Sequence, residues 1–207
     1  MASPRIETQD KDKSADSDPA PLQEKVLSPI SLAHVVFRTS NYDKMVKFWT
    51  SFLGATIAHS DSTLAFLRYD DEHHRIAIIA VPYTTPRVPT AAGLHHVAFS
   101  FSSFSDLVHA YQQRKALGIL PKWSVNHGPT TSIYYEDPDH NLVETQVDNY
   151  DSIEEANKFM QSELFRENPI GTDFDPEDLV NMVHSGVKEE VIKKRVEVGP
   201  RGLPEEL

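Results

Sequence analysis

The sequence predicts an α+β fold in which two tandem βαβββ modules form one curved mixed sheet. Three observations predict it. A strand-like run at residues 32–38 returns 62 residues later at residues 94–100, an amphipathic helical pattern follows each run, and each helix leads into three further strand-like runs. A single module would leave one sheet face bare, so we expect the two modules to share a sheet with the helices outside and a concave pocket inside.

The elements of the two modules follow in the same order. In the first module the helical pattern carries Met45, Val46, Trp49 and Phe52 and ends near Gly54, and strands are expected at residues 55–60, 64–69 and 76–81. In the second the helix carries Leu107, Val108, Tyr111 and Leu117 and ends at Gly118, before strands at 122–125, 131–136 and 142–147. Trp49 and Tyr111 occupy equivalent positions, which favours packing roles.

Three parts of the chain differ in composition. Residues 1–30 are polar and charged, which is typical of a disordered leader. Residues 31–147 form the predicted domain, with modules at about 31–83 and 93–147. Residues 148–207 contain 15 acidic and 7 basic residues and carry helix signals, with Asp175 as N-cap, Pro176 in the first turn and Gly186 as a stop. We expect this acidic helical extension to lie across the domain or across a second subunit.

Composition excludes several functional classes. The chain of 207 residues has no cysteine, so disulfides and thiolate-ligated metals are excluded and any metal must be held by histidine and carboxylate. The net charge of -11 disfavours nucleic acid and anionic lipid as partners. No apolar run is long enough to span a membrane, and the N-terminus has no signal-peptide pattern, so we expect a cytoplasmic protein.

Three residues are candidate metal ligands. The repeat places His34 and His96 at equivalent strand positions, and Glu144 interrupts the apolar run of the last strand. A buried carboxylate is costly alone, but a divalent cation shared with two imidazoles offsets its charge. We therefore predict a metal site formed by His34, His96 and Glu144. Strand alternation points His95 to the opposite face, in a packing role.

The paired modules and their motifs resemble the vicinal oxygen chelate superfamily, which includes glyoxalase I, bleomycin resistance proteins and type I extradiol dioxygenases. The resemblance covers about residues 31–147. Residues 130–144, TTSIYYEDPDHNLVE, are similar to the closing hairpin that supplies the last metal ligand in this superfamily. His140 stands where a glycine is more usual in that turn, and histidine tolerates the required dihedral angles better than most residues.

Finer matches resemble the extradiol dioxygenases, such as catechol 2,3-dioxygenase and biphenyl-2,3-diol 1,2-dioxygenase. Residues 66–77 are similar to the segment that carries an aromatic pocket residue and an acid–base histidine, which implies these roles for Phe66 and His74, and His73 is expected to point away. The resemblance also implies catalytic and substrate-binding roles for His127 and Tyr134. Glyoxalase I adds a fourth ligand from the strand at residues 76–81, but this sequence has no carboxylate there.

The resemblance implies an Fe(II)-dependent extradiol dioxygenase of aromatic catabolism that cleaves a catechol-type diol with O2, with Mn(II) as a possible substitute. Two histidines and one carboxylate leave open positions that suit Fe(II) with substrate and O2. Two alternatives stay open: another metal-dependent enzyme of the superfamily (isomerase, epimerase or lyase), and a non-catalytic small-molecule binding protein. The expected partners are a small aromatic diol and further copies of the chain in a homodimer or higher oligomer.

Overall fold

The computed structural model describes residues 25–85, 87–88 and 90–204, and these residues divide into two units at the boundary between Leu32 and Ala33. Residues 25–32 of the first unit contain no helix or strand, and the rest of the predicted leader lies outside the described residues. Within the described part of the chain, no helix combines the length and apolar character that crossing a membrane requires. All the elements described below belong to the second unit.

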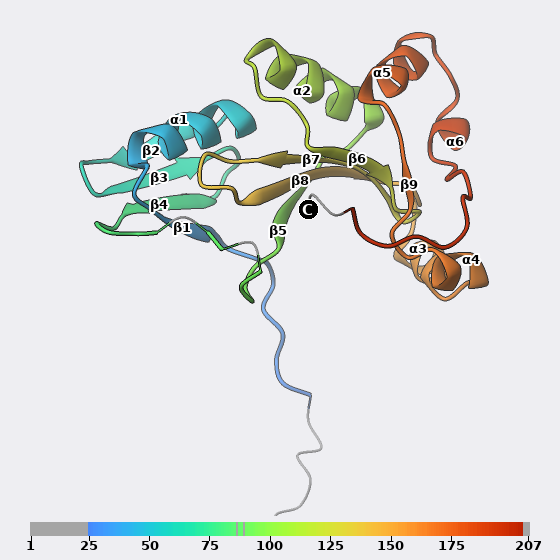
Figure 1. The fold of residues 1–207 in the computed structure, drawn as a ribbon, viewed down its shortest axis with the longest axis horizontal. Helices are drawn as coiled ribbons and strands as arrows, with labels where there is room; N and C mark the ends of the chain where they lie inside the picture. The colour runs from blue at the N-terminus through green and yellow to red at the C-terminus, as the bar shows by residue number, and fades with distance from the viewer. Residues whose placement is uncertain (1–24, 86, 89, 205–207) are drawn as a thin grey trace, which may run out of the picture. The chain divides into compact units, whose positions relative to one another are not determined.

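The first module has the predicted order of elements (Figure 1). They are β1 (Val35–Thr39), α1 (Tyr42–Leu53), β2 (Thr56–Ser60), β3 (Leu64–Arg68) and β4 (Ile76–Ala80). The sheet order is β1-β4-β3-β2, with β1 parallel to β4 and the other pairs antiparallel. Helix α1 ends as predicted at Gly54, whose φ of 60° is left-handed.

The second module repeats this arrangement. Its elements are β5 (His96–Ser100), α2 (Phe104–Ala116), β6 (Trp123–Asn126), β7 (Thr130–Glu136) and β8 (Leu142–Asp148). The order is β5-β8-β7-β6-β9, again with a parallel pair, β5 and β8, beside antiparallel ones. In the β7–β8 turn His140 adopts a φ of 66°, the positive value expected where the superfamily more usually has glycine.

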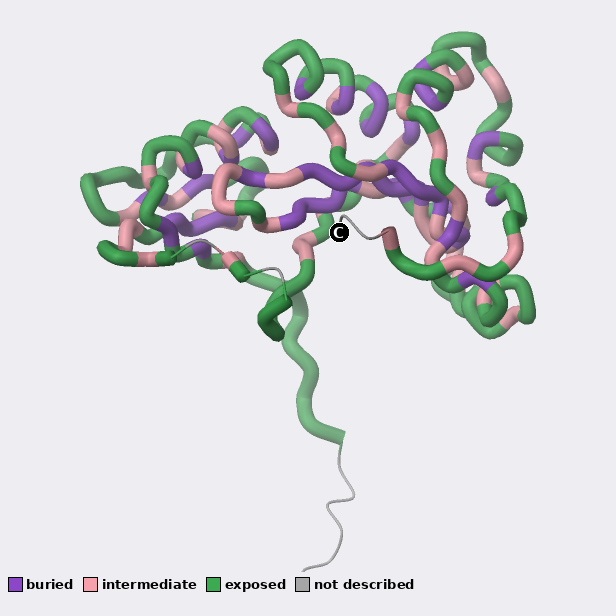
Figure 2. The backbone as a smooth tube through the Cα atoms, in the orientation of Figure 1, coloured by how far each residue is buried: buried purple, intermediate pink, exposed green. Residues whose placement is uncertain are grey.

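The α+β class and the duplicated βαβββ modules are confirmed, but the expected single sheet is replaced by two. The described strands form a four-stranded and a five-stranded hydrogen-bonded sheet, because β1 and β5 each take their parallel partner from their own module. Side chains join the modules instead. Trp49 lies 6.0 Å from Phe99 and Phe52 lies 5.1 Å from Tyr135 between ring centroids, and the buried Arg114 guanidinium donates to the Phe52 carbonyl at 2.8 Å. Buried residues run along both sheets in Figure 2.

Residues beyond β8 form the expected helical extension: α3 (Ile153–Met160), α4 (Glu163–Glu167), β9 (Thr172–Asp173), α5 (Pro176–His184) and α6 (Glu189–Ile192). The Asp175 side chain caps α5 by accepting from the Glu177 amide at 2.9 Å, as predicted. The extension packs on the second module, since β9 pairs with β6 and Tyr111 of α2 donates a hydrogen bond to Glu177 of α5.

Candidate functional site

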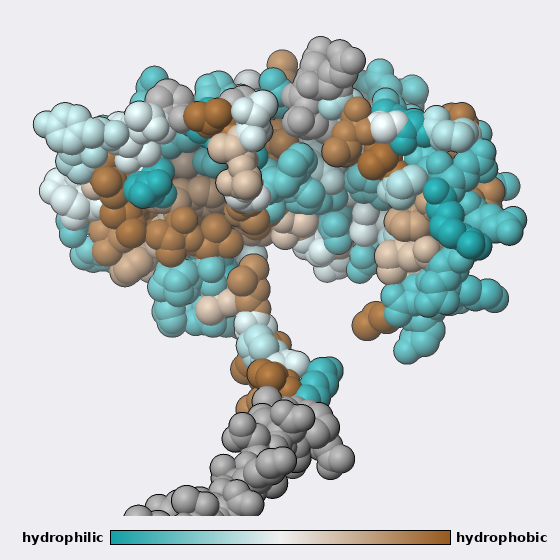
Figure 3. All heavy atoms as spheres, turned by 60° about the horizontal axis from the view of Figure 1, so that its bottom comes forward, coloured by the Kyte–Doolittle hydropathy of each residue, from teal (hydrophilic) through white to brown (hydrophobic). Residues whose placement is uncertain are grey.

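The face of the first module's sheet that lies opposite the core is partly exposed and can carry a site. On β1, Phe37 and Thr39 are buried whereas Val36 and Arg38 are exposed, so the face opposite the core begins at His34, one residue before the strand. Val36 and Ile79 on this face are 47% and 36% exposed. Figure 3 shows apolar side chains gathered over the first module.

Three of the predicted site residues meet on this face. The His34 and His74 rings lie 4.5 Å apart between centroids, and Phe66 stacks on His74 at 4.4 Å. His73 does not point away as expected, because its Nδ1 lies 2.5 Å from Nδ1 of His74. The two histidines precede β4, so the alternation that separates neighbours in a strand does not apply to them.

The electrostatics of this group affect His74. Burial lowers its pKa, and the neighbouring His34 and His73 rings lower it further by disfavouring a second positive charge. His74 is therefore biased toward the neutral imidazole, which can accept a proton.

The second module brings His96 and Glu144 together. His96 opens β5, Glu144 lies on the neighbouring β8, and their Nε2 and Oε2 atoms are 3.0 Å apart. Glu144 is only 4% exposed. Burial alone would raise its pKa, but hydrogen bonds from His96 and Ser132 outweigh burial and hold the pKa below its usual value. The carboxylate is thus kept ionised inside the protein.

His95 is not on the opposite face from His96, contrary to the sequence prediction. Its Nδ1 lies 2.8 Å from Nδ1 of His96, and their rings meet edge to face at 5.1 Å. The strand begins at His96, so His95 lies outside the alternation on which the prediction depended. The contact of each neighbouring histidine with His74 and His96 is a feature that the sequence did not reveal.

His127 and Tyr134 form a second pair beside Glu144. His127 follows β6, and its Nε2 lies 3.0 Å from the Tyr134 hydroxyl, while Nδ1 lies 2.5 Å from the Ile170 carbonyl oxygen. A carbonyl only accepts, so Nδ1 carries a hydrogen and, in the neutral ring, Nε2 is the acceptor. Burial lowers the pKa of His127 despite the Ile170 bond, which favours that neutral ring.

Tyr134 connects this pair to His96. Its ring stacks on Trp123 at 5.0 Å and meets His96 edge to face at 5.3 Å. Burial, together with the Glu144 carboxylate, raises the pKa of the Tyr134 hydroxyl, so the phenol keeps its proton.

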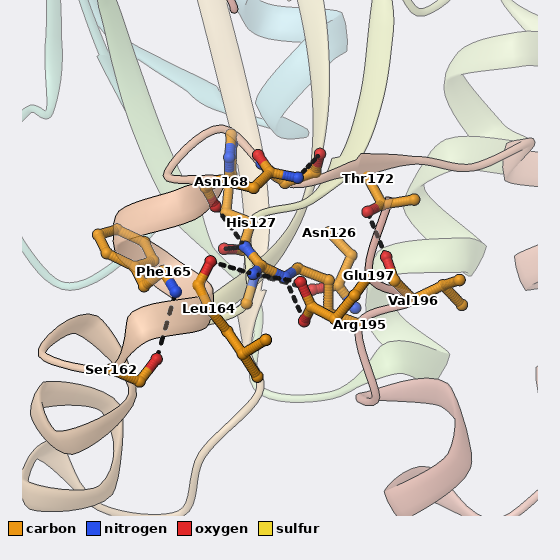
Figure 4. A network of polar contacts seen from close by, with 12 residues as sticks. Asn126, His127, Ser162, Leu164, Phe165, Asn168, Thr172, Arg195, Val196 and Glu197 are labelled. Atoms are coloured by element: carbon orange, nitrogen blue, oxygen red, sulfur yellow. Dashed lines mark hydrogen bonds and ion pairs between the residues drawn. The ribbon is translucent and has the colours of Figure 1, made fainter. Parts of the chain in front are cut away.

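Residues of the extension contact this pair, and the sequence did not reveal them. The Ile170 carbonyl oxygen contacts the His127 ring, and the Arg195 guanidinium donates to the backbone oxygens of both His127 and Asn168. Figure 4 shows Arg195 between these two residues. A backbone carbonyl has no signature in sequence. Arg195 is one of seven basic residues in the extension, and nothing in the sequence distinguishes it from the others.

The predicted ligands, two histidines and one glutamate, are residue types that bind divalent metals. The structure brings two of the three, His96 and Glu144, into contact. Among the residues that the structure describes, no three histidine, cysteine or acidic side chains lie close enough together to hold an ion. Two donors about 2.1 Å from one ion and at a right angle would be about 3 Å apart, which matches the 3.0 Å between His96 and Glu144. His34 lies at the equivalent position of the other module, against His74.

A separate cavity of about 560 Å³ lies between β1, the segment after β4 and the β7–β8 turn. Arg87 closes part of it by donating to the carbonyls of Leu94 and His140 at 3.2 Å each. None of the predicted metal-binding or catalytic residues lines this cavity, although Val36, on the same sheet face as His34, does.

Comparison with known proteins identifies the class. The family model of the Glyoxalase/Bleomycin resistance protein/Dioxygenase superfamily matches residues 31–145, and the chain belongs to this superfamily. A solved glyoxylase/bleomycin resistance protein/dioxygenase domain from Frankia sp. EAN1pec shares the fold, with a TM-score of 0.51 and 18% identity over 60% of this chain and 96% of that one.

Two curated relatives from Rhodococcus globerulus are more similar in sequence. Biphenyl-2,3-diol 1,2-dioxygenase 2 is 42% identical over 70% of this chain and 76% of its own length, and biphenyl-2,3-diol 1,2-dioxygenase 3 is 38% identical over 79% and 87%. Opening a 2,3-diol at its 1,2 bond breaks the ring beside the hydroxylated carbons, which is extradiol cleavage. The chain groups with these extradiol ring-cleaving dioxygenases.

Proposed function

We propose that the protein is an Fe(II)-dependent extradiol dioxygenase that cleaves the ring of a catechol-type diol with O2. The observation that carries this proposal is the His96–Glu144 pair at 3.0 Å, an ionised carboxylate and an imidazole on neighbouring strands, with the His127–Tyr134 pair beside it. The similarity to two biphenyl-2,3-diol 1,2-dioxygenases supports the reaction class.

The proposed ligands are His34, His96 and Glu144. Two imidazoles and one carboxylate are the donors that non-haem Fe(II) oxygenases use, and Mn(II) accepts similar donors. When bound, the ion supplies the redox chemistry that links the diol to O2. The 3.0 Å separation of His96 and Glu144 supports this assignment, because it suits two neighbouring ligands of one ion.

The first module supplies a surface for an aromatic ring and a base. Phe66 and the exposed Val36 and Ile79 provide apolar area on the face of the sheet that carries His74. His74 is biased toward its neutral form, so it can accept a proton from a diol hydroxyl near neutral pH and return it later in the reaction.

The second module supplies groups that hold protons in place. Tyr134 remains protonated and donates its one hydrogen to Nε2 of His127, so its hydroxyl oxygen can accept a hydrogen bond from a hydroxyl of the substrate. His127 offers an Nε2 acceptor at the Tyr134 hydroxyl and fixes the orientation of that hydroxyl. We propose that these two residues bind the oxygens of the substrate during ring opening.

Oxygen uptake tests the proposal. Protein reconstituted anaerobically with Fe(II) is exposed to air with a panel of monocyclic and biphenyl-type diols, and oxygen consumption is followed with absorbance of the ring-opened product. One O2 consumed per product formed is the expected result. Activity under nitrogen with Co(II) or Zn(II) would instead indicate an isomerase, epimerase or lyase, and diol binding without turnover for any metal would indicate a binding protein.

A further inference from the structure

The extension supplies none of the predicted site residues, yet it encloses the turn that carries His127. We propose that Arg195 and the loop of residues 168–171 are positioning residues that hold His127 with its Nε2 acceptor facing Tyr134. This inference rests on the proposed function, and it assigns the extension a role in the site.

The loop presents one carbonyl to His127. The Ile170 oxygen accepts from Nδ1 of the imidazole at 2.5 Å. The Asn168 side chain fixes the shape of the loop, since its Oδ1 accepts from the amides of Ile170 at 3.2 Å and Gly171 at 2.8 Å, and its Nδ2 donates to the Gly171 carbonyl at 3.0 Å. The orientation of the Ile170 carbonyl is therefore determined by a buried asparagine.

Arg195 connects this loop to the turn. Its guanidinium donates to the backbone oxygens of His127 at 3.1 Å, Asn168 at 2.8 Å and Leu164 at 3.2 Å. Glu197 pairs with the same guanidinium at 2.7 Å, so the buried charge is compensated. One planar, five-donor group thus ties the backbone at His127 to the loop that binds its ring.

Close packing leaves this arrangement little freedom. A Cβ placed on Gly171 would lie 2.2 Å from the Asn126 oxygen, and one on Gly128 would lie 2.1 Å from the Phe159 ring. The Phe159 ring also lies under Arg195, 5.0 Å from the guanidinium carbon. The turn is therefore held from the loop on one side and from α3 on the other.

The consequence concerns the tautomer of His127. With the Ile170 carbonyl in place, the hydrogen of the neutral ring is on Nδ1 and the lone pair of Nε2 faces the Tyr134 hydroxyl. Without Arg195 the pairing of β6 with β9 still joins the two segments, but the bonds from the guanidinium to the His127 and Asn168 carbonyls are lost, and the ring has more freedom to rotate or exchange tautomers. A role confined to folding would change stability but not the tautomer of the folded molecules.

The test compares Arg195→Met with Arg195→Lys and with the matched control Arg166→Met. Arg166 is an exposed arginine of the same extension whose side chain donates only locally, to the Ser162 carbonyl at 3.4 Å. The ¹⁵N resonances of the His127 ring, assigned with His127→Gln, are measured on metal-free protein. Turnover of Fe(II)-loaded protein is measured separately and normalised to the folded fraction.

In the wild type and in Arg166→Met, we expect the His127 ring to show one protonated nitrogen, Nδ1, and one unprotonated nitrogen, Nε2. In Arg195→Met we expect the two ¹⁵N resonances to move toward each other, because the ring then exchanges between its two tautomers. Turnover per folded molecule should fall about 10- to 100-fold in Arg195→Met. The turnover of Arg195→Lys should lie between that of the wild type and that of Arg195→Met, since an ammonium group cannot reach all three carbonyls in one plane. If Arg195→Met does not fold, Arg195→Lys decides the question by the same two measurements.

Unchanged His127 resonances with unchanged turnover in the Arg195 variants would overturn the inference, as would a wild-type ring protonated on Nε2. The NMR measurement does not depend on the reaction. If the wild type cleaves no diol, the proposed function fails while the tautomer result still decides whether Arg195 positions His127.

Discussion

Replacing Gly171 with alanine tests how tightly the extension is packed against His127. Gly171 has a φ of 107°, and an added Cβ would lie 2.2 Å from the Asn126 oxygen and 2.7 Å from the His127 Cα. The backbone strain costs about 1–3 kcal/mol and the overpacking about 1–3 kcal/mol more. We expect the free energy of unfolding to fall by about 2–6 kcal/mol, out of a total of about 5–15 kcal/mol for a domain.

The same substitution should impair the site. Relieving the contact requires a shift of about 1 Å, which would stretch the 2.5 Å bond between His127 and Ile170 to about 3.5 Å, beyond a normal hydrogen bond. A displacement of that size can lower turnover about 100-fold. Turnover of the variant should therefore fall more than its folded fraction does.

Gly186→Ala is the matched control. Gly186 lies in the same extension with a φ of 69° and has no atom within 4 Å of an added Cβ, so only the left-handed strain of about 1–2 kcal/mol applies. Urea unfolding of both variants isolates the packing contribution. Equal losses of stability in the two variants, or full turnover in Gly171→Ala, would refute the reasoning.

Three further predictions follow from the site and its supports. Tyr134→Phe removes the partner of His127 Nε2 and should lower turnover about 10- to 100-fold while costing about 1 kcal/mol in urea unfolding; unchanged turnover would contradict the role of the hydroxyl. Asp137→Ala removes the carboxylate that accepts hydrogen bonds from the Asn141 amide at 2.9 Å and from Trp49 Nε1 at 3.3 Å. Calorimetry should show that the free energy of unfolding falls by about 2–4 kcal/mol. The control Asp71→Ala, at an exposed aspartate, should change it little. Burial lowers the pKa of His127 in the folded protein below the ordinary pKa of histidine, which holds in the unfolded chain. The stability that the neutral His127 ring contributes is therefore fully present above the ordinary pKa and is lost as the pH falls through the pKa of the folded state. Urea unfolding between pH 7.5 and 5 should therefore show a smaller decline in His127→Gln than in the wild type, and parallel declines would count against a buried neutral ring.

The repeat and its elements could be predicted from sequence because local signals agree with the fold. Strand runs 62 residues apart, the glycine after α1 and the Asp175–Pro176 start of α5 each have a physical meaning that holds without tertiary context. The separation into two sheets could not be predicted, since hydrogen-bond partners of edge strands depend on how whole modules pack.

Some contacts among the candidate site residues agree with the sequence prediction. The contact of His96 with Glu144 agrees with the repeat position and strand alternation, and the contact of Phe66 with His74 agrees with what the resemblance to extradiol dioxygenases implied. The positions of His73 and His95 did not follow, because both precede a strand and alternation begins only inside it. The contact of Ile170 with His127 joins residues 43 apart through a backbone carbonyl, and no side-chain pattern encodes it.

Metal content tests the central claim most directly. Wild-type protein and Glu144→Gln are purified without chelator, loaded anaerobically with Fe(II), desalted and analysed for iron by mass spectrometry. Gln keeps the size of the side chain but loses the charge that the two imidazoles and the ion would share. We predict about one iron per chain in the wild type and almost none in folded Glu144→Gln. Equal iron in both, or none in the wild type under conditions where it cleaves a diol, would contradict the claim that His34, His96 and Glu144 hold the ion.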